Sequence, residues 1–198
     1  MTRLSAEDRR EQILIAARAE FLSVGPGGAR ISRIAERANV NQALLYRFFP
    51  SKEAMFDAAV IEPLDHMLSD LLVEVSRRVE VEHAAVVIEK FFRTLLGIFT
   101  ETFELFSIVL FSDRTSGHEF YRTRIVPFVD NLVDQVNRAS DQWRQNQDPA
   151  ITVPMSVGMC WGVVMDAHFR EIEIDLDAAA AQLAAFSFAG IFGTSRAD

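Results

Sequence analysis

Apolar residues recur through most of the chain at intervals of three and four, which is the spacing of an amphipathic helix. Near the start, Ile13, Ala17 and Phe21 lie four residues apart, so that a helix would place them on one face. No convincing run alternates apolar and polar residues as a half-buried strand does. The pattern therefore predicts an all-α protein.

Residues that cap or break helices mark the ends of the first predicted helix. Ser5 to Asp8 form a capping-box-like start with acidic residues in the first turn. Residues 25–28, Gly-Pro-Gly-Gly, predict that the helix ends there in a flexible loop.

Two short helices joined by a tight turn follow. The first is expected over residues 30–38, with a weak cap because no Ser or Thr precedes it. Asn39 can adopt the left-handed conformation in the turn, and Asn41 can cap a third helix that buries Leu45 and Phe49. This arrangement is typical of a helix-turn-helix module that places one helix in a DNA major groove.

Six further helices are predicted. The fourth helix is long, opens at residues 50–53 and bends near Pro63, which cannot donate a backbone hydrogen bond. The others are expected at residues 82–100, 102–112, 119–145, 151–171 and 176–194. Breaks are expected at Gly117, Pro127, Asp148-Pro149 and the Asp175/Asp177 cap.

The charge of the chain is divided unevenly. The 198 residues carry a net charge of −8, which is unusual for a protein that contacts phosphates. Residues 1–53 hold nine Lys and Arg against six Asp and Glu, a net of +3, whereas residues 54–198 hold eleven against twenty-two, a net of −11. The basic end would therefore be the docking face, and the acidic remainder would discourage non-specific wrapping of DNA.

Composition also bears on compartment and chemistry. The single Cys160 cannot form an internal disulfide, and no signal peptide is visible, so a cytoplasmic location is expected. The apolar runs 151–165 and 178–193 are shorter than a membrane span of about 18–20 residues. The four His residues are scattered along the sequence without metal-ligand spacing, so no metal site is expected. Cys160 and His168 would lie about 12 Å apart along one helix, so neither catalysis nor a cofactor is expected.

Residues 9–56 resemble the DNA-binding domain of the tetracycline-repressor (TetR) family of transcriptional regulators. The resemblance covers about a quarter of the chain and keeps several spaced elements in order. The matching elements are Ile13…Ala17…Phe21…Gly25, Ile34-Ala35, Ala38-x-Val40, Leu45-Tyr46-x-x-Phe49 and Lys52-Glu53.

The resemblance implies a homodimer with two domains per subunit. Residues 1–53 would form the DNA-binding domain, and residues 54–198 a helical domain that binds a small molecule and dimerises. Two such modules would read the half-sites of a palindromic operator, and the protein would act as a repressor that a small apolar or aromatic effector releases from DNA.

The resemblance also implies which residues contact DNA. Gln42, Ala43, Leu44 and Arg47 occupy base-reading positions, which suits their chemistry, because Gln pairs with adenine, Arg with guanine, and Leu or Ala with a thymine methyl. Tyr46 and Lys52 would hold phosphates, and the second helix would approach the backbone. The full predicted set is Arg30, Ile31, Ser32, Gln42, Ala43, Leu44, Tyr46, Arg47 and Lys52.

Several positions depart from the family pattern. Ala29-Arg30 stands where a Thr or Ser commonly caps the second helix. Asn39 and Ala43 replace glycines that are usual there, and Phe48 replaces a usual His. Phe48 removes a polar group from the groove-facing side, so the DNA sequence that this module reads is expected to be unusual.

The C-terminal part is rich in aromatic residues, and this allows two interpretations. Taken alone, these residues favour an ordinary helical core over a cavity, and only the resemblance favours a cavity. The predicted pocket residues are Phe91, Phe92, Phe99, Phe103, Phe106, Trp161, Met165 and Phe169. Polar groups that could orient a ligand there are Glu89, Arg93, Glu104, Asp166 and His168.

The last two helices are expected to form a dimer interface. Gly158-x-x-x-Gly162 permits close backbone approach, and the final helix is apolar nearly all round, so a second copy is the economical cover. The predicted interface residues are Gly158, Gly162, Leu183, Phe186 and Phe192. Two alternatives remain: an enzyme or carrier that uses the aromatic cavity without binding DNA, and a membrane-associated helical bundle.

Overall fold

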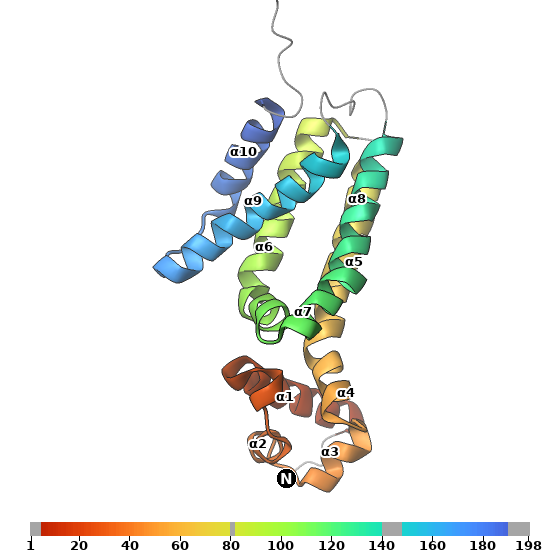
Figure 1. Cartoon of the computed structure of the whole chain (residues 1–198), viewed down its shortest axis with the longest axis vertical. Helices are drawn as coiled ribbons and strands as arrows, with labels where there is room; N and C mark the ends of the chain where they lie inside the picture. The colour runs from red at the N-terminus through yellow and green to blue at the C-terminus, as the bar shows by residue number, and fades with distance from the viewer. Residues whose placement is uncertain (1–4, 80–81, 140–147, 190–198) are drawn as a thin grey trace, which may run out of the picture. The chain divides into compact units, whose positions relative to one another are not determined.

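A computed structural model describes residues 5–79, 82–139 and 148–189 of the chain (Figure 1). Within these residues every regular element is a helix, which confirms the prediction of an all-α protein.

The chain divides into two compact units. The N-terminal unit contains residues 1–66 and 104–118, and the C-terminal unit contains residues 67–103 and 119–198. Helices α5 (Glu62–Val79) and α6 (Ala84–Phe111) each begin in one unit and end in the other. The compact units thus divide within these two helices, whereas the predicted domain boundary lay at residue 53.

Helix α1 (Ala6–Gly28) begins at the predicted capping box. The Ser5 hydroxyl accepts a hydrogen bond of 3.0 Å from the Asp8 amide, and the Asp8 carboxylate accepts from the Ser5 amide. The prediction that residues 25–28 form a loop is wrong. Gly25 adopts a φ of 71°, which only kinks the helix, and Pro26 then opens one more helical turn, because its fixed φ suits a first-turn position.

The turn between α2 (Ile31–Arg37) and α3 (Gln42–Phe48) is as predicted. Asn39 has a φ of 48° in the left-handed region, and the Asn41 side chain accepts a 2.8 Å hydrogen bond from the Leu44 amide. No side chain caps the first turn of α2, since Arg30 stands at its N-cap. These features depend on local sequence alone, and the sequence therefore indicates them correctly.

The helical path after α3 departs from α-geometry just before Pro63. Helix α4 (Lys52–Phe56) leads into a π-helical segment, η1 (Asp57–Ile61), which leads into α5. Because Pro63 has no N–H, it cannot donate to the Ala59 carbonyl, its partner in a regular α-helix. The Arg18 guanidinium of α1 donates to that buried carbonyl at 2.9 Å instead. A second π-helical segment, η2 (Tyr121–Ile125), likewise precedes Pro127, near the start of α8 (Val126–Arg138).

Two predicted breaks are wrong. Residues 84–111 form the single helix α6, which continues through Thr100, whose hydroxyl donates to the Leu96 carbonyl within the helix at 2.8 Å. Gly117 lies inside α7 (Arg114–Phe120). A Cβ at Gly117 would lie 2.2 Å from the Leu110 carbonyl oxygen, so this glycine permits a close approach of α7 to the end of α6.

The last two helices lie close to their predicted positions. Asp148 caps α9 (Pro149–Arg170) and Asp175 caps α10 (Leu176–Ser187). Asp177 is not a cap but pairs with Arg93 of α6. Figure 1 shows α9 crossing α6, and α8 running beside α5, where Gln135 donates to the Leu72 carbonyl. The predicted helical residues 140–145 and 190–194 lie outside the described residues.

Two described helices, α6 and α9, are long and apolar enough to cross a membrane by length and composition alone. Half of the apolar window of α6 is buried inside the protein, as in a core helix, but only 28% of that of α9. The apolar run 151–165 was predicted to be too short to span a membrane. That prediction does not hold for the whole helix, because α9 continues to Arg170. Packing in the core of this chain therefore does not account for the apolar face of α9, most of which is exposed.

The Arg18 hydrogen bond gives a test of the fold. We expect Arg18→Met to destabilise the protein by about 1–3 kcal/mol, because the buried Ala59 carbonyl loses its charged donor while apolar volume is kept. Urea unfolding measures this change. Arg138→Met is the control, because the Arg138 side chain is 77% exposed on α8 and should change stability by less than about 0.5 kcal/mol. Equal unfolding midpoints for both variants would contradict the assigned role.

Candidate functional site

Helix α3 presents polar side chains on a buried base. Leu45 and Phe49 are almost completely buried and fix the helix against the N-terminal unit. Gln42, Ala43 and Arg47 remain exposed, and the Tyr46 side chain is half exposed. The structure thus brings these predicted DNA-contacting residues together on one short helix, while Leu44 lies partly beneath the surface.

Helix α1 forms the frame on which the other short helices pack. Its residues Ile13, Ala17 and Phe21 are fully buried. The rings of Phe21 and Phe56 meet edge to face with centroids 5.0 Å apart, which joins α1 to α4. Aromatic pairs of this geometry stabilise beyond their buried area, so the frame holds α4 in a defined position.

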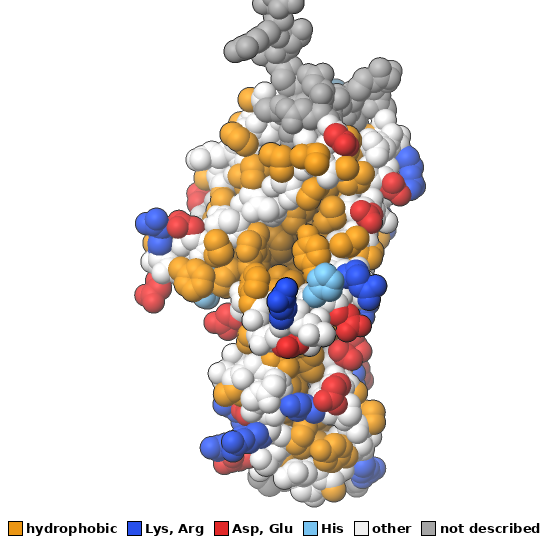
Figure 2. Space-filling view, in the orientation of Figure 1, with side chains coloured by type: hydrophobic (Ala, Val, Ile, Leu, Met, Phe, Trp, Pro, Cys, Tyr) orange, Lys and Arg blue, Asp and Glu red, His pale blue; other side chains and the backbone are white. Residues whose placement is uncertain are grey.

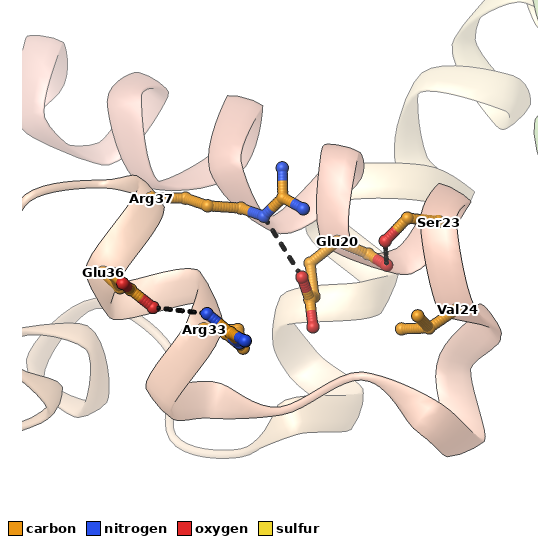
Figure 3. A pocket seen from close by; sticks show the side chains of 6 residues that line it. All are labelled: Glu20, Ser23, Val24, Arg33, Glu36 and Arg37. Atoms are coloured by element: carbon orange, nitrogen blue, oxygen red, sulfur yellow. Dashed lines mark hydrogen bonds and ion pairs between the residues drawn. The ribbon is translucent and has the colours of Figure 1, made fainter.

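An ion pair that the sequence did not reveal joins α2 to α1. The Glu20 side chain is almost completely buried, and its carboxylate accepts a hydrogen bond of 3.2 Å from Arg37 (Figure 3). These two residues line a cleft of about 510 Å³. Arg33 and Glu36, 3.0 Å apart, form a second pair there. Because its charged groups pair with one another, we interpret this cleft as part of the helix packing.

The remaining predicted DNA contacts lie around α2 and α4. Arg30 and Ser32 are exposed at the start of α2, and Ile31 is half buried. The Lys52 ammonium donates a 2.9 Å hydrogen bond to the Pro26 carbonyl, which the additional turn of α1 presents. An ammonium has three N–H donors, so this bond positions Lys52 and leaves donors for a phosphate.

Several cations of the N-terminal unit have no acidic partner. Within the described part of the chain, Arg10, Arg30 and Arg47 form no ion pair and are exposed. Unpaired guanidinium groups on one small unit attract polyanions, since Arg presents a rigid fork of donors that fits phosphate oxygens and base edges.

Aromatic side chains of α6 and α9 form a cluster in the C-terminal unit. Trp161 of α9 stacks on Phe103, with ring centroids 5.0 Å apart, and meets Phe99 edge to face at 5.4 Å. Phe103 also contacts the rings of His168 and Phe169. Phe91 and Phe92 lie 5.7 Å apart further along α6.

The structure places other predicted pocket residues elsewhere. Phe106 is buried in the N-terminal unit, whereas Phe99, Phe103 and Trp161 belong to the C-terminal unit. Met165 and Phe169 are 41% and 76% exposed, so they lie on the surface. The five predicted polar groups, Glu89, Arg93, Glu104, Asp166 and His168, are all exposed in this chain, so none of them is enclosed within the C-terminal unit.

Burial makes Cys160 a poor nucleophile. Its side chain is completely buried on α9, and this desolvation raises the pKa of the thiol to about 12. A neutral thiol neither attacks substrates nor binds metals well. Within the described residues, no group of three or more His, Cys, Asp or Glu side chains is placed to hold a metal ion.

Helices α9 and α10 expose an apolar face. Ile151, Met155 and Phe169 of α9 and Phe186 of α10 are all more than half exposed, and hydrophobic side chains spread over this part of the surface in Figure 2. A Cβ added at Gly158 or Gly162 would meet no atom within 4 Å, so these glycines border open space. Leu183 is half buried, and Phe192 lies outside the described residues.

Comparisons with known proteins agree with this arrangement. The family model described as bacterial regulatory proteins, tetR family, matches residues 13–59. The nucleoid occlusion factor SlmA of Marinomonas sp. (strain MWYL1) is 33% identical over 152 residues, which cover 74% of each chain.

Two solved structures share the fold. SmeT in its complex with triclosan is 21% identical, with a TM-score of 0.70, and the match covers 93% of this chain and 91% of SmeT. FadR from Bacillus subtilis in complex with stearoyl-CoA is 16% identical, with a TM-score of 0.68 and coverage of 92% and 98%. The chain belongs to the TetR family of bacterial transcriptional regulators.

Proposed function

We propose that the protein is a cytoplasmic, dimeric repressor that binds a palindromic operator and leaves it when a small apolar or aromatic effector binds. One observation carries the proposal: α3 holds Gln42, Tyr46 and Arg47 exposed on a buried frame. Family membership supports the class of function, and the exposed residues of this unit support the mechanism of DNA binding.

The DNA contacts divide into two kinds. Gln42, Ala43, Leu44 and Arg47 would read base edges in the major groove, where Gln and Arg form bidentate bonds to adenine and guanine. Tyr46, Lys52 and the start of α2, at Arg30, Ile31 and Ser32, would bind the backbone and fix the register. Lys52 suits this role because the Pro26 carbonyl already holds its ammonium in place.

The aromatic cluster supports an apolar or aromatic effector. Trp161 stacks on Phe103 and meets Phe99, so the three rings form one continuous surface between α6 and α9. SmeT binds triclosan, and the Bacillus subtilis FadR binds stearoyl-CoA. We infer that the effector of this chain binds against these rings, in a site to which Phe91, Met165 and Phe169 contribute the rim and the buried Phe92 the interior wall.

The exposed face of α9 and α10 supports a homodimer. Each exposed apolar side chain of this size costs about 1.5–3 kcal/mol relative to a buried one, and four of them lie on this face. Gly158 and Gly162 leave room for a partner helix to approach closely. A second copy turned about a two-fold axis would cover this face and form a four-helix bundle.

Helices α5 and α6 could transmit the effector signal, because each has residues in both compact units. The effector must bind the DNA-incompetent state more tightly than the DNA-competent state, since a ligand shifts an equilibrium only by its difference in affinity. The chain would therefore act by binding and not by catalysis. An enzyme that uses the aromatic cluster would instead turn over an aromatic compound and show no affinity for DNA.

The two kinds of DNA contact should respond differently to mutation. Operators are first selected from random duplexes. Gln42→Ala should then lose about 1–3 kcal/mol of discrimination at one base position while the salt dependence of binding stays unchanged. Lys52→Ala should weaken binding to all sequences and flatten the plot of log K against log salt, by about 0.9 for each phosphate that the protein no longer neutralises. If both variants bind as the parent does, with the same base preference, the assigned roles are wrong.

A single charged substitution in the proposed interface should separate the dimer into monomers. We expect Phe186→Glu to yield monomers in sedimentation experiments, because each subunit would bury an unpaired carboxylate in the interface. Operator affinity should fall at least a hundredfold when two modules no longer bind together. Val73→Glu is the matched control, because Val73 is half exposed on α5 and should leave the dimer intact. A Phe186→Glu variant that remains dimeric would contradict this interface.

The effector site is testable with triclosan as a probe. We expect Trp161→Ala to raise the dissociation constant for triclosan at least tenfold, because the stacking surface is removed. Operator affinity without ligand should stay within about twofold of the parent, since the DNA-contacting residues are unchanged. Isothermal titration and operator retention measure the two quantities. Unchanged triclosan binding in this variant, in a parent that binds it, would place the site elsewhere.

A further inference from the structure

Arg10 of α1 is held beside the end of α3, although it lies outside the residues that the family model matches. Its guanidinium carbon lies 5.3 Å from the centroid of the Phe49 ring. Phe49 is almost completely buried and forms the C-cap of α3, so the ring is a fixed platform. Cation–π contacts of this length stabilise the charge over the ring and restrict where it can lie.

The position of Phe49 shows what Arg10 faces. Gln42 and Tyr46 lie four residues apart on an exposed stripe of α3, and Phe49 follows three residues after Tyr46 as the buried C-cap of the helix. Gln42 and Tyr46 are two of the proposed DNA contacts on that stripe. Because Arg10 contacts Phe49, its guanidinium lies at the C-terminal end of the helix that carries them.

The charge of Arg10 has no partner in the described part of the protein. The side chain is exposed and forms no ion pair there, although Glu7 and Glu11 are close in sequence. Stacking on Phe49 has already restricted the guanidinium, so less side-chain entropy is lost when it binds an anion. A planar guanidinium in this situation fits phosphate oxygens in a bidentate manner.

We propose that Arg10 binds a phosphate of the DNA backbone beside the C-terminal end of α3, in addition to the contacts of α2, α3 and α4. This proposal rests on the proposed DNA-binding function. It adds a contact from α1, a helix that otherwise serves as the frame. Because a phosphate carries no sequence information, Arg10 contributes affinity and orientation but no base preference.

The salt dependence of operator binding by the full-length dimer tests the proposal. Arg10→Gln should reduce the slope of log K against log salt by about 0.9 per subunit, or about 1.8 per dimer, because each subunit then displaces counterions from one phosphate fewer. Affinity at the lowest salt should fall on the order of tenfold, with parent and variant converging as salt rises. Arg10→Lys keeps the charge and should keep the parent slope.

Arg138→Gln is the control for net charge. Its side chain is exposed on α8, far along the chain from α3, and it should change neither slope nor base preference. Arg10→Gln with the parent slope, while the parent binds its operator, would overturn the proposal and leave the DNA-binding function intact. A changed base preference in Arg10→Gln would also overturn it, because Arg10 would then read a base. A parent that binds no duplex would end both proposals.

Discussion

The two helices of the helix-turn-helix are too short to hold their own shape. Isolated helices of fewer than about 12–15 residues are marginal in water, and α2 and α3 have seven residues each. Their geometry therefore depends on burial against α1, through side chains such as Ile13 and Phe21 and through the ion pair of Glu20 with Arg37. Arg18 extends the same frame to the π-helical segment before Pro63. The position of α3 thus depends on α1 largely through α2, which packs against both helices.

A second constraint acts at the other end of the chain. Helices α9 and α10 leave several large apolar side chains in water on one part of the surface, which is unfavourable. In the proposed dimer, pairing with a second copy would satisfy this constraint and double the DNA-binding surface. The same pairing would fix the separation of two α3 helices, so that a symmetric protein would read a symmetric sequence. In this account, the net negative charge of the C-terminal part confines DNA to the basic modules.

Features set by local sequence could be predicted, and features set by tertiary contacts could not. Asn41 as a cap and Asn39 with positive φ follow from single-residue preferences and short-range hydrogen bonds. The continuity of α6 and the helical turn after Gly25 depend on packing, which the pattern of Gly and Thr does not reveal. The aromatic residues of the predicted pocket share a composition but not a location, since Phe106 is buried in the other unit and Phe169 is exposed.

In the proposed dimer, the apolar face of α9 and α10 holds two α3 helices one DNA turn apart. The most direct measurement is operator affinity as a function of half-site spacing, in duplexes that carry a selected palindrome. Inserting five base pairs at its centre turns the half-sites to opposite faces of the duplex, and inserting ten increases their distance by about 34 Å. We expect both insertions to reduce the affinity of the dimer to that for a single half-site. Affinity that is independent of half-site spacing would show that the two modules are not rigidly joined, and it would contradict the proposed dimer.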